Sequence, residues 1–132
     1  MSPKVKKVIK TDRAPAAIGP YSIAIQQGHT LYTSGQLGID PATGNLVEGG
    51  VEAETRQALI NLKNILEAAG TSLENVVKTT VYLRDMADFA RMNTIYAEFL
   101  GTNSPARSAV QVVLPRNGAV EIEAIALVPE ND

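Results

Sequence analysis

The stretch from Val120 to Val128 constrains the fold more than any other part of the chain. Side chains alternate between the two faces of a strand, and one face here carries Val120, Ile122, Ala124, Ala126 and Val128. The other face carries Ile125 and Leu127, so the strand is apolar on both faces toward its end. Two arrangements would cover both faces: helices of the same chain on each side, or helices on one side and a second copy of the chain on the other.

Length and composition limit what the chain can do. With 132 residues, 45% hydrophobic and 20% charged, residues 1–132 are the size of one domain, which buries about two thirds of its unfolded surface. The chain has no cysteine, which excludes disulfides, thiolate zinc sites and cysteine nucleophiles, and His29 alone offers no imidazole pair for a metal ion. A net charge of −2 gives no excess of basic residues for phosphates, which argues against a dedicated nucleic-acid binder.

Hydrophobic spacing predicts two helices and several short strands. One helix is expected from Val51 to Gly70, and a second between Asp85 as its N-cap and Gly101 just past its end. Strands are expected at Val5–Ile9, Ser22–Gln26, Leu31–Gln36, Val76–Arg84, Arg107–Leu114 and Val120–Val128, with His29 in a solvated hairpin turn. This order predicts an α+β fold with two helices on one face of a mixed sheet.

The sequence shows neither a membrane span nor a targeting signal. No uncharged apolar run approaches the 18 residues that a span needs, and residues 1–10 lack the apolar core of a secretory signal. We therefore expect a soluble, cytoplasmic protein without membrane contacts.

Two polar residues stand out among apolar neighbours. Asn93 falls in the apolar stripe of the second helix, where its amide needs a hydrogen-bond partner, either a neighbouring backbone group or a ligand. Arg107 is the only charged residue of its strand. A guanidinium in such surroundings suits a planar carboxylate, which it binds through two parallel hydrogen bonds, but a snorkelling surface arginine has the same pattern.

Carboxylates and loop hydroxyls provide the other candidates. Glu121 and Glu123 point to the same strand face as Ile125 and Leu127. Half-burial would raise the pKa of one carboxylate and suit it to general base or acid work. A solvent-facing strand end also explains both glutamates, and the sequence by itself favours that explanation. Tyr21 and Ser34 lie in turn-like segments, and taken by themselves they are explained by ordinary turn chemistry more readily than by a functional site.

The distance between Arg107 and Glu121 depends on how the last two strands are arranged. If these strands formed a simple hairpin, the two residues would lie about six positions apart along it, or about 20 Å. Either the strands are not neighbours in the sheet, or the two residues meet by another route, such as across a subunit boundary. The order of the chain leaves both possibilities open.

Five segments together resemble one known family. They are Ala14 to Ser22, Ser34 to Gln36, Asn75 to Val81, Pro105 to Ser108 and Glu121 to Ala126. In this order and spacing they are similar to the RidA (YjgF) family of reactive-intermediate deaminases, over nearly the whole chain. The resemblance implies a chorismate-mutase-like α+β fold and a homotrimer with a ligand cleft at each subunit interface.

The resemblance also implies a reaction and a set of residues. The expected enzyme is a 2-iminobutanoate/2-iminopropanoate deaminase, which hydrolyses 2-enamine and 2-imino acids such as 2-aminoacrylate to 2-keto acids and ammonia, with no cofactor and no metal. Arg107 matches the arginine that binds the substrate carboxylate, and Glu121 matches the carboxylate that directs the attacking water. Residues that match pocket positions are Tyr21, Ser34, Gly35, Asn93 and Ala109, the last in place of a cysteine that many members carry.

Two other functions stay open beside this one. Some members of the family are described as endoribonucleases or translation inhibitors, although the net charge and the single histidine argue against RNA chemistry here. A non-catalytic or chaperone-like protein that binds small carboxylates in the same cleft is the other alternative.

Overall fold

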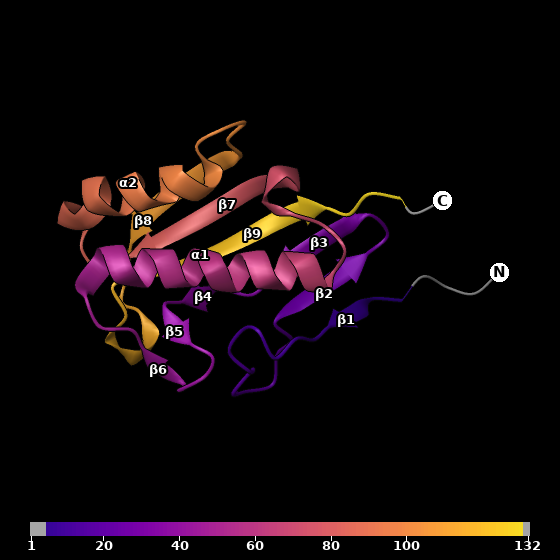
Figure 1. Ribbon diagram of the computed structural model, residues 1–132, viewed down its shortest axis with the longest axis horizontal. Coiled ribbons are helices and arrows are strands. Elements are labelled where there is room, and N and C mark those ends of the chain that lie inside the picture. The colour runs from indigo at the N-terminus through magenta and orange to yellow at the C-terminus, as the bar shows by residue number, and fades with distance from the viewer. Residues whose placement is uncertain (1–4, 131–132) are drawn as a thin grey trace.

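The computed structural model describes residues 5–130 and has two layers, a mixed sheet and a pair of helices (Figure 1). The sheet runs in the order β1-β2-β3-β9-β7-β8, and β4 also pairs with β9. These strands are β1 Lys7–Ile9, β2 Ala24–Gln27, β3 Thr30–Thr33, β4 Gln36–Leu37, β7 Val76–Leu83, β8 Ala106–Gln111 and β9 Val120–Leu127. The helices are α1 Gly50–Ala68 and α2 Phe89–Leu100.

The remaining elements are short. Strands β5 Ile39–Asp40 and β6 Asn45–Leu46 pair as a separate two-stranded ribbon. There are also three short 3-10 helices, η1 Leu73–Asn75, η2 Met86–Asp88 and η3 Pro115–Asn117. All sheet pairs are antiparallel except β7 with β8, which are joined through α2 and run parallel. The predicted α+β class with two helices and a mixed sheet is thus confirmed.

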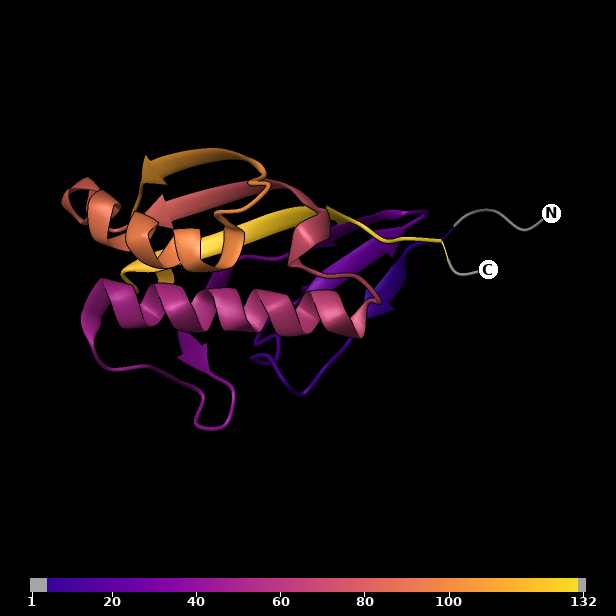
Figure 2. The same cartoon turned by 45° about the horizontal axis from the view of Figure 1, so that its top comes forward.

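Strand β9 lies in the middle of the sheet, and only one of its faces is covered. The side chains that point beneath the helices are at most 3% exposed; they are Val120, Ile122, Ala124 and Ala126. Figure 2 shows α1 and α2 side by side on the same side of the strands. On the other face Leu127 is 49% exposed. The alternative in which helices of the same chain cover both faces is therefore wrong, and this second face is called the open face below.

The helices form where the hydrophobic spacing predicts them. In α1 the spaced residues Ala58, Leu59, Leu62, Ile65 and Leu66 are at most 1% exposed, and Gly70 closes the helix with a φ of 85°. The start of the second helix differs from the prediction. Asp85 accepts a hydrogen bond from the Ala87 backbone N–H at 2.9 Å and caps η2, so that α2 begins at Phe89.

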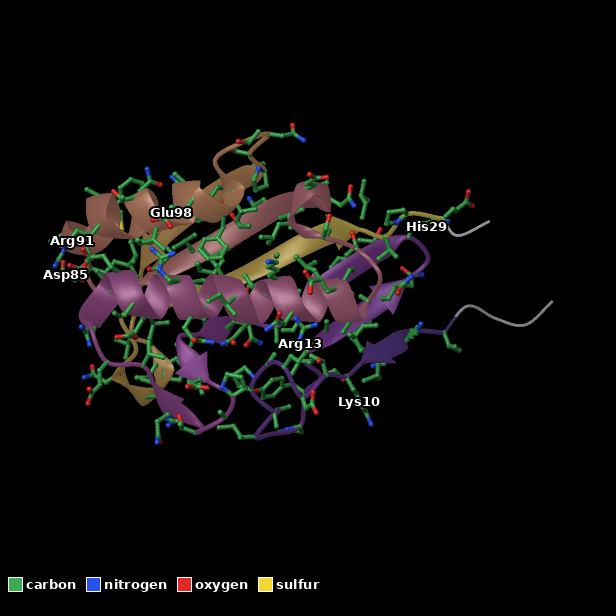
Figure 3. The ribbon with its side chains drawn as sticks, in the orientation of Figure 1. Lys10, Arg13, His29, Asp85, Arg91 and Glu98 are labelled. Atoms are coloured by element: carbon green, nitrogen blue, oxygen red, sulfur yellow. The ribbon has the colours of Figure 1, made fainter. Side chains whose placement is uncertain are left out.

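The outer surface of the helices and the turns is charged. Arg56 on α1 pairs with Glu98 on α2 at 2.8 Å. Figure 3 shows Glu98 and Arg91 along α2, and His29 at the turn between β2 and β3. The His29 side chain is 62% exposed, as expected for a turn residue. None of the helices among residues 5–130 is long and apolar enough to cross a membrane.

Candidate active site

Glu121 lines a pocket on the open face of the sheet. Because its neighbours Val120 and Ile122 point beneath the helices, β9 directs Glu121 to the open face, where it is half-buried. The pocket has a volume of about 440 Å³ and a mainly apolar wall. Its lining residues are Pro15, Ala16, Ile18, Tyr21, Gly35, Gln36, Leu37, Ile39, Pro41, Gly44, Pro115, Arg116 and Glu121. Three predicted site residues, Tyr21, Gly35 and Glu121, therefore share one pocket.

Gly35 leaves the space that the Glu121 side chain occupies. A Cβ built on Gly35 would lie 2.7 Å from Cδ and 2.9 Å from Oε1 of Glu121. Ser34, one residue earlier, is engaged in structure: its hydroxyl donates to the Ser22 carbonyl at 2.6 Å, and its N–H donates to the Ile23 carbonyl at 2.9 Å. Ser34 thus holds the chain after β3 in place and is not among the pocket-lining residues.

The carboxylate of Glu121 lies in an environment that disfavours its charge. Burial raises the pKa of Glu121 above the ordinary glutamate value, and the negative charge of Glu123 raises it further. Among residues 5–130, no side-chain or backbone donor forms a hydrogen bond with Glu121 outside the strand ladder. The simple picture of two solvated glutamates is wrong for Glu121, whose oxygens remain available to a water molecule or a ligand.

Arg107 lies in a second cluster, beneath α2. Its Nη1 donates to Oδ1 of Asn93 at 2.6 Å, and its Cζ lies 4.7 Å from the centroid of the Tyr96 ring and 5.3 Å from that of Phe89. No carboxylate within residues 5–130 forms an ion pair with Arg107. Asn93 is thus satisfied by a guanidinium, not by a neighbouring backbone group. Arg107 is partly buried rather than a solvated surface residue.

The two clusters lie on opposite faces of the sheet. Arg107 on β8 is opposite Thr79 on β7, which is 1% exposed beneath the helices, whereas Glu121 on β9 is opposite Tyr82 on the open face. Strand β7 separates β8 from β9, so the two residues are offset by about 10 Å along the strands and about 10 Å across them. The hairpin arrangement of the last two strands is wrong, and one chain does not bring Arg107 and Glu121 together.

Ala109 belongs to the cluster around Arg107. It lies two residues further along β8, on the same face, and packs against the core. The structure therefore divides the predicted residues into two groups, with Tyr21, Gly35 and Glu121 in one and Asn93, Arg107 and Ala109 in the other.

Several residues of these clusters do not stand out in the sequence as site residues. Phe89 and Tyr96 flank Arg107. Their spacing from Asn93 places all three on one face of α2, but it does not indicate that this face contacts Arg107. Arg116 lines the pocket and donates to the Gly44 carbonyl at 3.0 Å, from a backbone with a φ of 59° that no sequence pattern reveals. Within residues 5–130, no three His, Asp or Glu side chains come together as a metal site would require.

Comparisons with known proteins agree with the resemblance found in the sequence. The family model for endoribonuclease L-PSP matches residues 11–128. A mouse protein named 2-iminobutanoate/2-iminopropanoate deaminase is 57% identical over 128 residues, covering 96% of this chain and 95% of the mouse protein. The human protein of the same name is 52% identical, covering 96% and 93% of the two chains.

Solved structures agree equally well. RidA from the Antarctic bacterium Psychrobacter is 50% identical, with a TM-score of 0.89, and the alignment covers 92% of this chain and 99% of that one. Escherichia coli TdcF, solved with bound serine, is 42% identical, with a TM-score of 0.88 and coverage of 93% and 99%. With the family model, these matches span nearly the whole length of the chain, and the chain therefore belongs to the RidA (YjgF) family, whose model is described as endoribonuclease L-PSP.

Proposed function

We propose that this protein hydrolyses reactive 2-enamine and 2-imino acids, such as 2-aminoacrylate, 2-iminopropanoate and 2-iminobutanoate, to 2-keto acids and ammonia. The observation that carries the proposal is that neither Arg107 nor Glu121 has an ion-pair partner of opposite charge among residues 5–130. One can bind a carboxylate and the other can bind water. The mouse and human relatives, named as deaminases of this kind, support the same reaction.

The reaction needs two positioned groups and a water molecule. Arg107 binds the carboxylate of the imino acid through parallel N–H donors. Glu121 accepts a proton from water as the water oxygen bonds to the C=N carbon and the electron pair of the C=N bond moves to nitrogen. Glu121 returns this proton to the nitrogen. The proton of the new hydroxyl then also moves to the nitrogen as the C–N bond breaks to release ammonia and the C=O bond forms. An enamine first takes a proton on its terminal carbon and loses one N–H proton, which converts it to the imine. Proximity to the held water supplies much of the acceleration.

The other site residues support these two. Tyr21 and the backbone of Gly35 line the pocket beside Glu121. Asn93 fixes Arg107, and the backbone of Ala109 lies next to it on the same strand face. No step in this scheme is assigned to a metal ion or to an organic cofactor.

The site is completed by a second copy of the chain, in a homotrimer. Arg107 and Glu121 face opposite sides of the sheet, which supports a cleft built from Arg107 of one subunit and Glu121 of the next. The open face supports the same assembly, because it exposes large apolar side chains on four strands. These are Val8 at 44%, Tyr32 at 47%, Val110 at 43% and Leu127 at 49% exposure.

Mixing two inactive variants tests both the reaction and the shared cleft. Arg107→Ala and Glu121→Gln should each abolish release of ammonia and 2-ketobutanoate from 2-iminobutanoate generated in situ. When equal amounts are unfolded and refolded together, each cleft has intact Arg107 with probability one half and intact Glu121 with probability one half. About a quarter of the wild-type activity should therefore return. No recovery in refolded trimers would contradict a cleft shared between subunits, and a wild type no faster than buffer would refute the reaction.

RNA cleavage is a second candidate because of the description that the family model carries. We expect no cleavage of single-stranded RNA by a nuclease-free preparation, since the chain has a net charge of −2 and no second histidine. Cleavage that disappears in Arg107→Ala would favour this candidate.

A binding or chaperone-like protein would instead retain a 2-keto acid at Arg107 without turnover of the imine. Function in the cytoplasm stays a prediction.

A further inference from the structure

The side chain of Arg107 is held by Asn93 and by two aromatic rings that neither the sequence motifs nor the family resemblance identifies. The rings of Phe89 and Tyr96 lie 5.3 and 4.7 Å from its Cζ, within the range of a cation–π contact. Its Nη1 is bound to Asn93. These three contacts come from one helix, α2, so that the orientation of the guanidinium depends on how α2 is held against the sheet.

Tyr96 is itself fixed from the sheet side by one hydrogen bond. The Tyr96 hydroxyl and Oγ1 of Thr79 are 2.7 Å apart, in the interior of the molecule, with Tyr96 5% and Thr79 1% exposed. Thr79 is the residue opposite Arg107 in the parallel ladder of β7 and β8. The bond therefore closes a ring of contacts that runs from Arg107 across the ladder to Thr79, through Tyr96 and back to the guanidinium.

Packing alone does not explain two hydroxyl groups at this place. Phe and Val would fill nearly the same volumes without any polar atom, and burying a hydroxyl is unfavourable unless its hydrogen bond is made. A buried pair that satisfies itself adds little net stability over such apolar replacements, but it fixes the position of a ring that otherwise could shift within the core. The ring that it fixes is the one nearest to Arg107.

We propose that the Thr79–Tyr96 hydrogen bond positions Arg107 for carboxylate binding, so that Thr79 and Tyr96 are positioning residues of the deaminase. An arginine side chain has many rotamers, and a fixed guanidinium loses less freedom when it binds. Asn93 uses one N–H of Nη1, which leaves the Nε and Nη2 donors for two parallel bonds to a carboxylate. The inference rests on the proposed function, because it assumes that Arg107 binds the carboxylate of the substrate.

The test removes both hydroxyls without leaving either one buried and alone. In Thr79→Val/Tyr96→Phe the fold should remain, with a Tm close to the wild type. The Kd for 2-ketobutanoate and the KM for 2-iminobutanoate should each rise about fivefold, the equivalent of one ordinary hydrogen bond, while kcat stays within about twofold. The single variant Thr79→Ser keeps the hydroxyl, so its Kd and KM should stay at the wild-type values. A merely structural pair would lower Tm without separating KM from kcat.

A matched control and a binding measurement separate the possible failures. Thr55→Val removes a buried threonine hydroxyl on α1 that has no hydrogen-bond partner among residues 5–130, and should change neither Kd nor KM. Unchanged Kd and KM in the double variant, or Thr79→Ser behaving like the double variant, would overturn the positioning role. A wild type that fails to hydrolyse the imine would refute the proposed function. The Kd for the keto acid would still test the positioning role in that case, because binding requires no turnover.

Discussion

Replacing Gly35 by alanine should disable the enzyme without unfolding it. The added Cβ would lie 2.7 Å from Cδ of Glu121, and ordinary contacts begin at 3.4 Å, so the carboxylate must move by about 0.7 Å to reach an ordinary contact. The atom in the way is the end of a flexible side chain, and Gly35 is not among the glycines with a positive φ. The backbone can therefore accept alanine, and the chain should retain its fold.

The expected loss follows from the displacement. A shift of about 1 Å in a group that positions a reactant can reduce the rate about 100-fold, so we expect kcat/KM for 2-iminobutanoate to fall between about 10- and 100-fold. Alanine also restricts the unfolded chain, which stabilises the fold by about 0.4–1 kcal/mol where the backbone is compatible. Tm should accordingly stay the same or rise slightly while activity falls.

The assay is the release of keto acid or ammonia from the imine, with thermal unfolding of the same samples. Gly19→Ala is the matched control, because its Cβ would meet only the Tyr21 ring, at an ordinary 3.7 Å, and activity should remain within about twofold of the wild type. If Gly35→Ala retained full kcat/KM, the Glu121 carboxylate would not be the group that directs water. A collapse of Tm would show that Gly35 matters for the fold.

Three further variants test the electrostatics and the packing. In Glu123→Gln a charge that raises the pKa of Glu121 is lost, so Glu121 should deprotonate more readily and the acid limb of the kcat/KM profile should move to lower pH; an unmoved limb would exclude coupling of the two carboxylates. Asn61→Ala removes buried hydrogen bonds to the Leu37 and Ile39 carbonyls at 3.3 and 2.9 Å, and urea unfolding at fixed protein concentration should show a loss of about 2–4 kcal/mol. Leu59→Ala empties a fully buried core position and should be less stable by about 2–5 kcal/mol in the same measurement, whereas a loss under 1 kcal/mol would contradict the packing described.

The local part of the fold could be predicted from the sequence. The 3.6-residue spacing in α1 and the alternation in β9 each depend on neighbours a few residues away, and both elements form within two residues of the predicted bounds. The pairing of strands is not local. Strand β7 inserts between β8 and β9 because the α2 crossover makes β7 and β8 parallel neighbours, and nothing in the short Leu114–Ala119 connection indicates that β8 and β9 are apart.

The site could be predicted as a set of residues but not as a geometry. Arg107 and Glu121 are recognisable because each is a charge among apolar neighbours. Their placement on opposite faces depends on registers across two ladders, which the spacing along one strand does not determine. The contacts of Arg107 with α2 could not be predicted either, because Asn93 has the same helical spacing whether its amide binds a backbone group or a guanidinium.

The central position of β9 has a consequence for how the chain folds. Strands β1, β2 and β3 pair among themselves and β7 pairs with β8, but the two groups are joined in the sheet only through β9, the last strand in chain order. Thr30, for example, pairs with Leu127, which lies 97 positions later in the chain, and such non-local pairing is slow to form. Until Val120–Leu127 has been synthesised, both groups present unpaired inner edges that can pair with other chains. Folding and synthesis are thereby coupled at the final strand, and a chain interrupted before Val120 should aggregate rather than fold in part.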